Sequence, residues 1–163
     1  LDSLGRVIGV NTAIRSFTGV NSVVGFAIRV GIVKRVVPDL IAHGRYRHPW
    51  LGVTGRTISP EMVEAADLPA EVGVLVFEVE VDSPAEKAGL RGGQQQITVS
   101  GVQMLAGGDI VVAIDEVEVR DFDDVVNFLA SHASVGDLVT LTVVREREEI
   151  KVGVTLEERP TSP

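Results

Sequence analysis

Short runs of Val, Ile and Leu, separated by glycine, proline and aspartate, are the feature of this sequence that most constrains its fold. Hydrophobic residues make up 45% of the 163 residues, whereas aromatic residues make up only 4%. Because β-branched side chains pack well on the pleated surface of a sheet, such a core favours strands. The longest apolar runs, such as residues 110–114, are far shorter than the ~20 residues of a membrane-spanning helix. We expect a globular protein built largely of strands, without membrane insertion in this segment.

The first 43 residues have the pattern of two strands followed by a helix. Pro38 lies inside the helical pattern and predicts a kink or a new helix start, and Gly44 is well placed to end the helix. We place a linker at residues 44–49. The expected elements are strands over residues 7–14 and 23–30, a loop over residues 17–22 and a helix over residues 32–43.

Residues 50–159 have the pattern of a second unit, in which strands alternate with short helices. Ser59 before Pro60 and Ser83 before Pro84 predict two helix starts, because serine caps a first turn and proline fits the first helical position. The stretch 91–105 is rich in Gly and Gln and predicts an inserted hairpin or a mobile loop. The polar tail, residues 157–163, is expected to fray, with residues 160–163 outside the domain. The expected strands cover residues 51–57, 73–79, 109–114, 116–119, 138–145 and 149–156, and the expected helices cover residues 60–66, 82–90 and 122–131.

Charge and cysteine content exclude several classes of function. The formal net charge is −8 and the only basic cluster, at Arg45, Arg47 and His48, is small, so we expect no binding of nucleic acid. The chain has no cysteine, which excludes disulfides and thiolate metal sites. The aspartates of residues 121–124 lack the glycine and the later glutamate of a calcium loop, and they fit the start of a helix instead. We therefore expect no metal and no cofactor.

Three segments together resemble a family of peptide-binding domains. Trp50-Leu-Gly-Val53 resembles the aromatic or aliphatic-Leu-Gly-hydrophobic loop of PDZ domains. Residues 82–90, DSPAEKAGL, and residues 108–115, GDIVVAID, resemble the SPAxxAGL and GDxIxxIxG signatures of bacterial PDZ domains, in the same order. This resemblance implies an α+β fold at residues 50–159, with a PDZ-like, partly open β-barrel flanked by two or three helices. It also implies capture of extended peptides as an added strand.

The preceding residues resemble the end of the trypsin-like barrel in HtrA (Deg) serine proteases. The similarity is carried by LDSLGRVIGVNTAI, GVNSVVGFAI and VKRVVPDLI, and residues 1–43 are therefore interpreted as the remnant of a protease domain with its linker helix. In that family a PDZ domain follows the protease barrel. Four positions or segments depart from the family pattern: Glu116 at a turn that is usually glycine, Arg29 in place of a proline, the pair Val23-Val24, and an insertion at residues 92–107.

Following the resemblance residue by residue gives a candidate site for the free end of a peptide. A terminal carboxylate needs backbone N–H groups that point inward, and a glycine lets the backbone curl around it. Residues at i, i+4 and i+7 of the helix 122–131 lie on one face, which would flank the peptide. The same apolar stripe also suits a buried core, and for Phe122 both interpretations stay open. The candidate residues are Trp50, Leu51, Gly52 and Val53 for the carboxylate loop, and Thr54, Phe122, Val126 and Leu129 for the groove.

No catalytic residue is expected in this chain. A serine protease needs a nucleophile, a His base and a carboxylate that orients the base. The resemblance places the nucleophile motif GNSGGPL just before Leu1, and the His and Asp in a part of the barrel that this chain lacks. Ser3 has no GNSGG turn before it, and none of His43, His48 and His132 lies in the context of a catalytic motif. The parent that the chain resembles would be a serine endopeptidase.

The resemblance implies a role in protein quality control. The domain would capture hydrophobic C-termini of unfolded substrates or regulatory peptides, and would deliver substrate or activate proteolysis. The parent would be a homotrimer or larger, periplasmic, membrane-anchored or extracellular, with its own protease domain as a further partner. An alternative is a structural, self-associating module, in which unpaired edges of the strands within residues 7–30 drive oligomerisation and the groove is closed.

Overall fold

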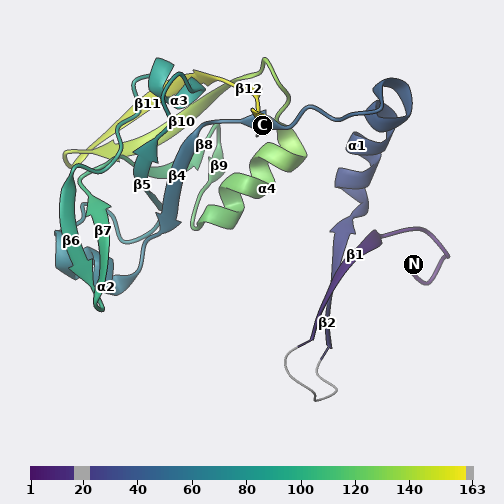
Figure 1. Cartoon of the computed structure of the whole chain (residues 1–163), viewed down its shortest axis with the longest axis horizontal. Helices are drawn as coiled ribbons and strands as arrows, with labels where there is room; N and C mark the ends of the chain where they lie inside the picture. Colours follow the sequence, from purple (N-terminus) through teal and green to yellow (C-terminus); the bar gives the residue numbers. More distant parts are fainter. Residues whose placement is uncertain (17–22, 161–163) are drawn as a thin grey trace. The chain divides into compact units, whose positions relative to one another are not determined.

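The computed structural model describes residues 1–16 and 23–160, and the chain divides into two compact units, residues 1–46 (unit 1) and residues 47–163 (unit 2) (Figure 1). Unit 1 holds an antiparallel hairpin followed directly by a helix. Its elements are β1 (Gly9–Ser16), β2 (Val23–Arg29) and α1 (Val30–His43). The two strands and the helix confirm the sequence prediction, whereas the loop predicted over residues 17–22 lies outside the described residues.

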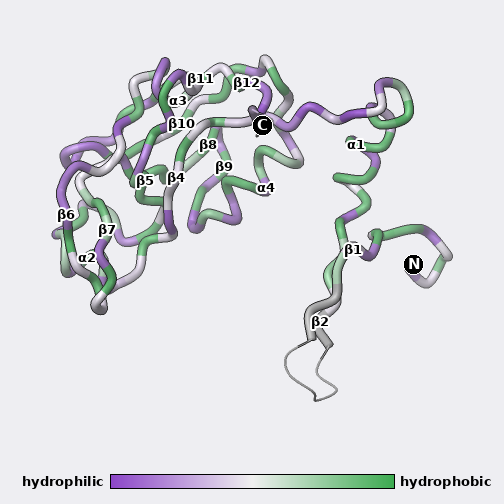
Figure 2. The backbone as a smooth tube through the Cα atoms, in the orientation of Figure 1, coloured by the Kyte–Doolittle hydropathy of each residue, from purple (hydrophilic) through white to green (hydrophobic). Residues whose placement is uncertain are grey.

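The helix α1 runs through Pro38 as a single element, so a new helix start there was a wrong prediction. Gly44 ends the helix as predicted, with a φ of 71° and an N–H that donates to the Leu40 carbonyl at 3.0 Å. Hydrophobic stretches of α1 are visible as green tube in Figure 2. They remain accessible, because Leu40 and Ile41 are 44% and 81% exposed and no residue of α1 is buried. Every core residue among the described part of the chain belongs to unit 2.

Unit 2 is built around an open six-stranded antiparallel sheet with the order β11-β10-β8-β5-β4, to which β9 is added beside β8. Three helices flank this sheet, which confirms the predicted α+β fold, and the sheet does not close into a barrel. Its elements are β3 (Pro49–Trp50), β4 (Val53–Thr57), α2 (Pro60–Ala66), β5 (Val74–Val79), α3 (Pro84–Lys87), β6 (Gln95–Val99), β7 (Val102–Ala106), β8 (Ile110–Ile114), β9 (Val117–Glu118), α4 (Phe122–His132), β10 (Leu138–Arg145), β11 (Glu148–Thr155) and β12 (Glu157–Glu158).

The helix starts of unit 2 follow the local signals in the sequence. The Ser59 side chain accepts a hydrogen bond from the Met62 N–H, and the Ser83 side chain accepts one from the Glu86 N–H at 3.1 Å. Asp121 caps α4 in the same way, through the Asp124 N–H at 2.8 Å. Each cap satisfies a backbone donor that the first turn of a helix leaves without a partner. The helix predicted over residues 82–90 is shorter than expected, because α3 is a single turn.

The insertion forms the hairpin β6–β7, which is the first of the two predicted alternatives. Its residues Ile97, Val99 and Ala106 are buried in a second hydrophobic cluster. Successive side chains of a strand point to opposite faces, so β5 serves both clusters: Val74 and Val76 enter the main one and Leu75 the second. The full second cluster consists of Ile58, Met62, Leu68, Leu75, Ile97, Val99, Ala106 and Ile110.

The end of unit 2 is paired with its beginning, so fraying from residue 157 was a wrong prediction. β12 pairs antiparallel with β3, with Glu157 opposite Trp50. The Arg159 N–H then donates to the His48 carbonyl at 2.9 Å, and Glu157 forms an ion pair with Lys87 at 2.6 Å. Polar side chains suggested a solvated tail, but a ladder is formed by backbone groups, which pair whatever the side chains are.

A buried carboxylate connects three segments of unit 2. Asp109 is 1% exposed and accepts hydrogen bonds from Nε and Nη2 of Arg145, both at 2.7 Å, and from the Arg91 N–H at 2.9 Å. Arg145 also donates to the Gly89 carbonyl at 2.8 Å. The Asp109 carboxylate thereby raises the pKa of the Arg145 guanidinium above its usual value. The start of β8, the end of β10 and the segment after α3 are held together by this cluster.

None of the helices in the described part of the chain is long and apolar enough to cross a bilayer.

Replacing Asp109 with Ala should lower the free energy of unfolding by about 3 kcal/mol, because the Arg145 guanidinium would lose its partner in a poorly solvated place. Urea unfolding followed by circular dichroism measures the loss. The matched control is Glu146→Ala, which removes an exposed ion pair with Arg91 and should cost less than about 1 kcal/mol. Losses of equal size in the two variants would contradict a structural role for the buried pair.

Candidate functional site

The loop between β3 and β4 is tied down by its carbonyl groups. The Leu51 carbonyl accepts a hydrogen bond from the Ala85 N–H, and the Gly52 carbonyl accepts one from the Glu80 N–H, both at 2.9 Å. No described peptide bond is cis, and in a planar trans unit the C=O and the following N–H point in opposite directions. The N–H groups of Gly52 and Val53 are therefore turned away from Ala85 and Glu80. Two backbone donors are left pointing outward from the start of β4.

Gly52 cannot be replaced by a larger residue without movement of its surroundings. Its φ is +80°, a conformation that favours glycine, and a Cβ at this position would lie 2.2 Å from the Cβ of Ser83. The same Cβ would lie 3.1 Å from Cζ2 of Trp50, so the only tryptophan of the chain sits against this loop. Ser83 is fully buried and caps α3. The two stretches at residues 50–53 and 82–90 thus form one unit in space.

The strand β4, which follows this loop, lies at an edge of the sheet. It pairs only with β5, and its other side has no strand neighbour among the described residues. Half-buried and exposed residues alternate along β4, so Val53, Gly55 and Thr57 share one face and Thr54 and Arg56 the other. The register irregularity between Thr54 and Gly55 places its extra residue, Phe77, on β5 and leaves this alternation intact. An edge of this kind can accept an extended peptide as a further strand.

The helix α4 lies beside β4 and is connected to its far end. The Phe122 N–H donates to Oγ1 of Thr57 at 3.0 Å, which joins the first turn of α4 to the last residue of β4. Val125 and Phe128 are buried in the main core, at 5% and 7% exposure. Val126 is 49% exposed, although it is an aliphatic residue in the middle of a helix. One apolar side of α4 is therefore left accessible.

The candidate residues occupy these elements, but their role in binding stays a prediction. Trp50, Val53, Phe122 and Leu129 are half-buried, and Thr54 is exposed. Phe122 and Leu129 pack partly against the main core, so they can line a groove only with the remainder of their surface. Leu51 is only 4% exposed, so its side chain can contribute at most to the floor of the groove.

Three groups that shape this region were not predicted from the sequence. The first is the Thr57 hydroxyl, which has no signal in the sequence because its partner lies 65 residues further on. The others are the N–H groups of Ala85 and Glu80. Ala85 lies in the segment 82–90, which was recognised by its resemblance, whereas Glu80 precedes it; the contacts of both with the loop at residues 51–52 depend on the tertiary fold.

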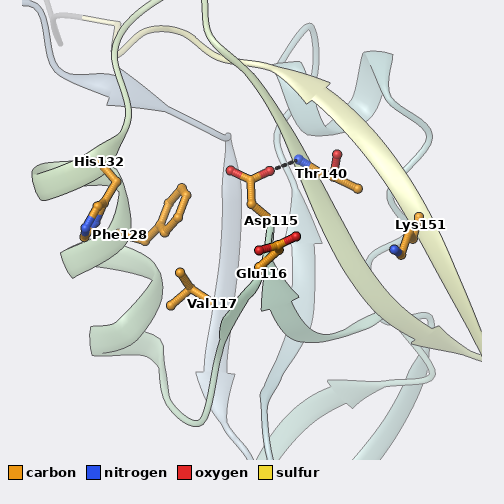
Figure 3. Close-up of a pocket in the computed structure, with 7 residues that line it drawn as sticks. All are labelled: Asp115, Glu116, Val117, Phe128, His132, Thr140 and Lys151. Atoms are coloured by element: carbon orange, nitrogen blue, oxygen red, sulfur yellow. Dashed lines mark hydrogen bonds between the residues drawn. The ribbon is translucent and has the colours of Figure 1, made fainter.

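A separate depression of about 680 Å³ lies where α4 approaches the β8–β9 turn (Figure 3). In it the Phe128 and His132 rings are stacked with centroids 5.4 Å apart, and the Asp115 carboxylate accepts a hydrogen bond from the Thr140 N–H at 2.8 Å. The positive φ of this turn falls on Asp115, at 53°, so Glu116 occupies the usual glycine position without left-handed strain. The lining residues are Asp115, Glu116, Val117, Phe128, His132, Thr140 and Lys151.

This depression contains none of the candidate peptide-binding residues. In the described part of the chain, no three His, Asp or Glu side chains are grouped so that they could hold a metal ion. Asp115 is already occupied in holding the turn against β10.

Comparison with known proteins shows similarity along almost the whole chain to HtrA-type proteases. The chloroplastic protease Do-like 1 of Arabidopsis thaliana is 36% identical over 160 residues, which are 98% of this chain and 34% of that protein. A probable periplasmic DegP-like serine endoprotease of Chlamydia trachomatis is 38% identical over 157 residues, 96% of this chain and 28% of that protein. The chain thus spans about a third or less of the length of these curated relatives.

The fold is found again among solved structures. The HtrA-type protease AlgW with a decapeptide superposes with a TM-score of 0.71 at 28% identity, over 99% of this chain and 45% of that one. Residues 49–156, which include the loop, the edge strand and α4, match the family model described as PDZ domain. With two thirds of its length in that match, the chain belongs to the PDZ domain family.

Proposed function

We propose that unit 2 binds the free C-termini of peptides, which add to β4 as a further strand between β4 and α4. The observation that supports this most directly is the orientation of the Gly52 and Val53 N–H groups, which follows from the anchored carbonyls of Leu51 and Gly52. Such N–H groups at the end of an unpaired strand are suited to receive a terminal carboxylate. The related AlgW structure was solved with a decapeptide, which supports the same class of ligand.

The exposed aliphatic side of α4 indicates the kind of residue that the groove prefers. Val126, together with the accessible parts of Val53 and Leu129, would surround the last side chain of the peptide. Phe122 would meet the side chain two residues earlier. We therefore expect a hydrophobic C-terminal residue and an affinity on the order of micromolar, about −8 kcal/mol.

In a longer protein with a protease domain, this binding would deliver unfolded substrate or activate proteolysis. The curated relatives are named as proteases, and several of them as periplasmic, which supports a role in protein quality control outside the cytoplasm. Assembly into trimers or larger oligomers would bring several such grooves together.

A second candidate function is self-association through unit 1. It is favoured by the accessible aliphatic residues of that unit, such as Val10, Ile28 and Ile41. Analytical ultracentrifugation separates the two functions, because self-association raises the mass with protein concentration whether or not a peptide is present. A constant monomer mass across concentrations would remove this candidate.

Binding should require the free carboxylate of the peptide. We expect a short peptide ending in Val or Phe to change the fluorescence of Trp50 in a saturable way, because this indole lies against the loop. The same peptide with an amidated end should give no saturable change at the same concentrations, since it lacks the charge that the backbone donors receive. Equal responses to the two peptides would show that the loop does not capture a C-terminus.

The substitution Val126→Lys should weaken binding at least about fivefold, because it places a charge on the apolar side of the groove. The free energy of unfolding should change by only about 0.5 kcal/mol, since the side chain is half exposed. Val102→Lys is the matched control: Val102 is 54% exposed in β7, and this variant should bind as the unchanged protein does. Calorimetric titration measures the affinities, and equal affinities of the two variants would remove Val126 from the groove.

Gly52→Ala should lower stability and weaken peptide binding at least about tenfold, which corresponds to about 1.4 kcal/mol. The added Cβ overlaps Ser83 and must displace the loop. The control is Gly101→Ala, with a similar φ of +82° and no atom within 4 Å of the added Cβ, which should cost only the backbone strain of about 1–2 kcal/mol. Urea unfolding and titration with the free-acid peptide measure both effects. A Gly52→Ala variant that binds normally would show that the loop geometry is not required.

A further inference from the structure

Arg56 lies in the middle of the edge strand β4 with its side chain exposed. It is the only charged residue of this strand. Several other cations of unit 2 are held by carboxylates: Arg91, Arg145 and Arg147 pair with Glu146, Asp109 and Asp67, respectively. Within the part of the chain that the structure describes, no carboxylate lies within ion-pair distance of Arg56.

The backbone of β4 determines which residue of an added peptide would face Arg56. With its carboxylate at the Val53 N–H, the last peptide residue pairs with Val53 and the peptide runs antiparallel to β4. Each step back along the peptide then matches one step forward along β4. The next-to-last residue lies opposite Thr54, and the residue three positions before the end lies opposite Arg56.

Directly opposite residues of an antiparallel pair project to the same face, with Cβ atoms about 5 Å apart. The side chain at that third position before the end would therefore stand beside the guanidinium of Arg56. An arginine presents a fork of N–H donors that matches a carboxylate. A carboxylate side chain at this position would find a partner there, and an ammonium would be repelled.

We propose that Arg56 makes the groove select peptides with Asp or Glu three residues before a hydrophobic C-terminal residue. This selectivity rests on the C-terminal binding proposed above and specifies its substrate class. It is confined to one position: opposite the next-to-last residue stands Thr54, whose own cross-strand neighbour on β5 is the acidic, exposed Glu78. A carboxylate moved to the next-to-last place would have Thr54 opposite it and would find no cation there.

The many acidic residues of unit 2 disfavour acidic peptides, which opposes the effect of Arg56. This repulsion acts over a longer range than the contact with Arg56. All of the 23 acidic residues except Asp2 and Asp39 lie in unit 2, so acidic peptides are repelled as they approach. At physiological salt the charges are screened beyond about 8 Å, whereas a side chain that touches Arg56 lies well inside that distance. The contact with Arg56 therefore decides the preference at this salt concentration.

The test compares three peptides that end in the same hydrophobic residue and carry Glu, Gln or Lys three positions before it. Calorimetric titration at physiological salt should show the Glu peptide binding about threefold to tenfold more tightly than the Lys peptide, with the Gln peptide between them. The difference has two parts, because Arg56 attracts the Glu side chain and repels the Lys side chain, both at an exposed site. Arg56→Glu should reverse this order, and Arg56→Gln should nearly abolish it.

Lys151→Glu provides the matched control, because it makes the same change in net charge on β11, at the opposite edge of the sheet. This variant should bind the three peptides in the same order of affinity as the unchanged protein does. A fourth peptide, with Glu in the next-to-last place, should show no benefit over its Gln counterpart.

The outcomes separate the two proposals. Saturable binding of all three peptides with equal affinity would overturn the role of Arg56 while C-terminal binding stands. If Lys151→Glu altered the order as much as Arg56→Glu did, the selectivity would come from net charge and the proposal would fail. Absence of binding by any of the peptides would overturn C-terminal binding itself, and the selectivity with it.

Discussion

The buried carboxylate of Asp109 is the constraint on which the geometry of unit 2 depends. A carboxylate removed from water must be compensated, and Arg145 and the Arg91 N–H provide that compensation from two distant segments. The start of β8 is thereby fixed against the end of β10 and the segment that leaves α3. Since α3 provides the support for the β3–β4 loop, the position of that loop is set indirectly by the same cluster.

The candidate site results from anchoring on one side and absence of pairing on the other. The carbonyls of Leu51 and Gly52 are held by N–H groups of the α3 region, and this turns the neighbouring N–H groups outward. The strand β4 has a single partner, β5, so one row of its backbone groups remains available. The helix α4 buries Val125 and Phe128 and leaves Val126 accessible. Recognition of a peptide end would then need little rearrangement, because the donors are already oriented.

The insertion contributes packing that a shorter domain of this kind would lack. The hairpin β6–β7 covers the side of the sheet to which Leu75 and Ile110 point, and with α2 it encloses the second hydrophobic cluster. The sheet is consequently covered on both faces at this end. A rigid sheet is useful to an edge strand that binds a ligand, since the strand must hold its register when a peptide is added. Unit 1 differs, because its described residues include no buried core.

Many elements of both units could be predicted from the sequence because their signals are local. Serine before proline predicted the starts of α2 and α3, Gly44 predicted the end of α1, and alternating β-branched runs predicted most strands to within a few residues. The resemblance at residues 50–53 and 82–90 located the candidate loop. These signals act within a few residues of the chain, where backbone conformation and capping are decided.

The tertiary structure alone decided the pairing of β12 with β3, the ion pair of Asp109 with Arg145, and the contact of Gly52 with Ser83. It also decided that β4 lies at an edge with Arg56 exposed on it. In each case the partners are separated by 30 residues or more, and only the folded chain brings them within reach. The sequence by itself therefore determined the elements and the class of domain, whereas the folded chain decided which backbone groups are used internally and which remain available for a ligand.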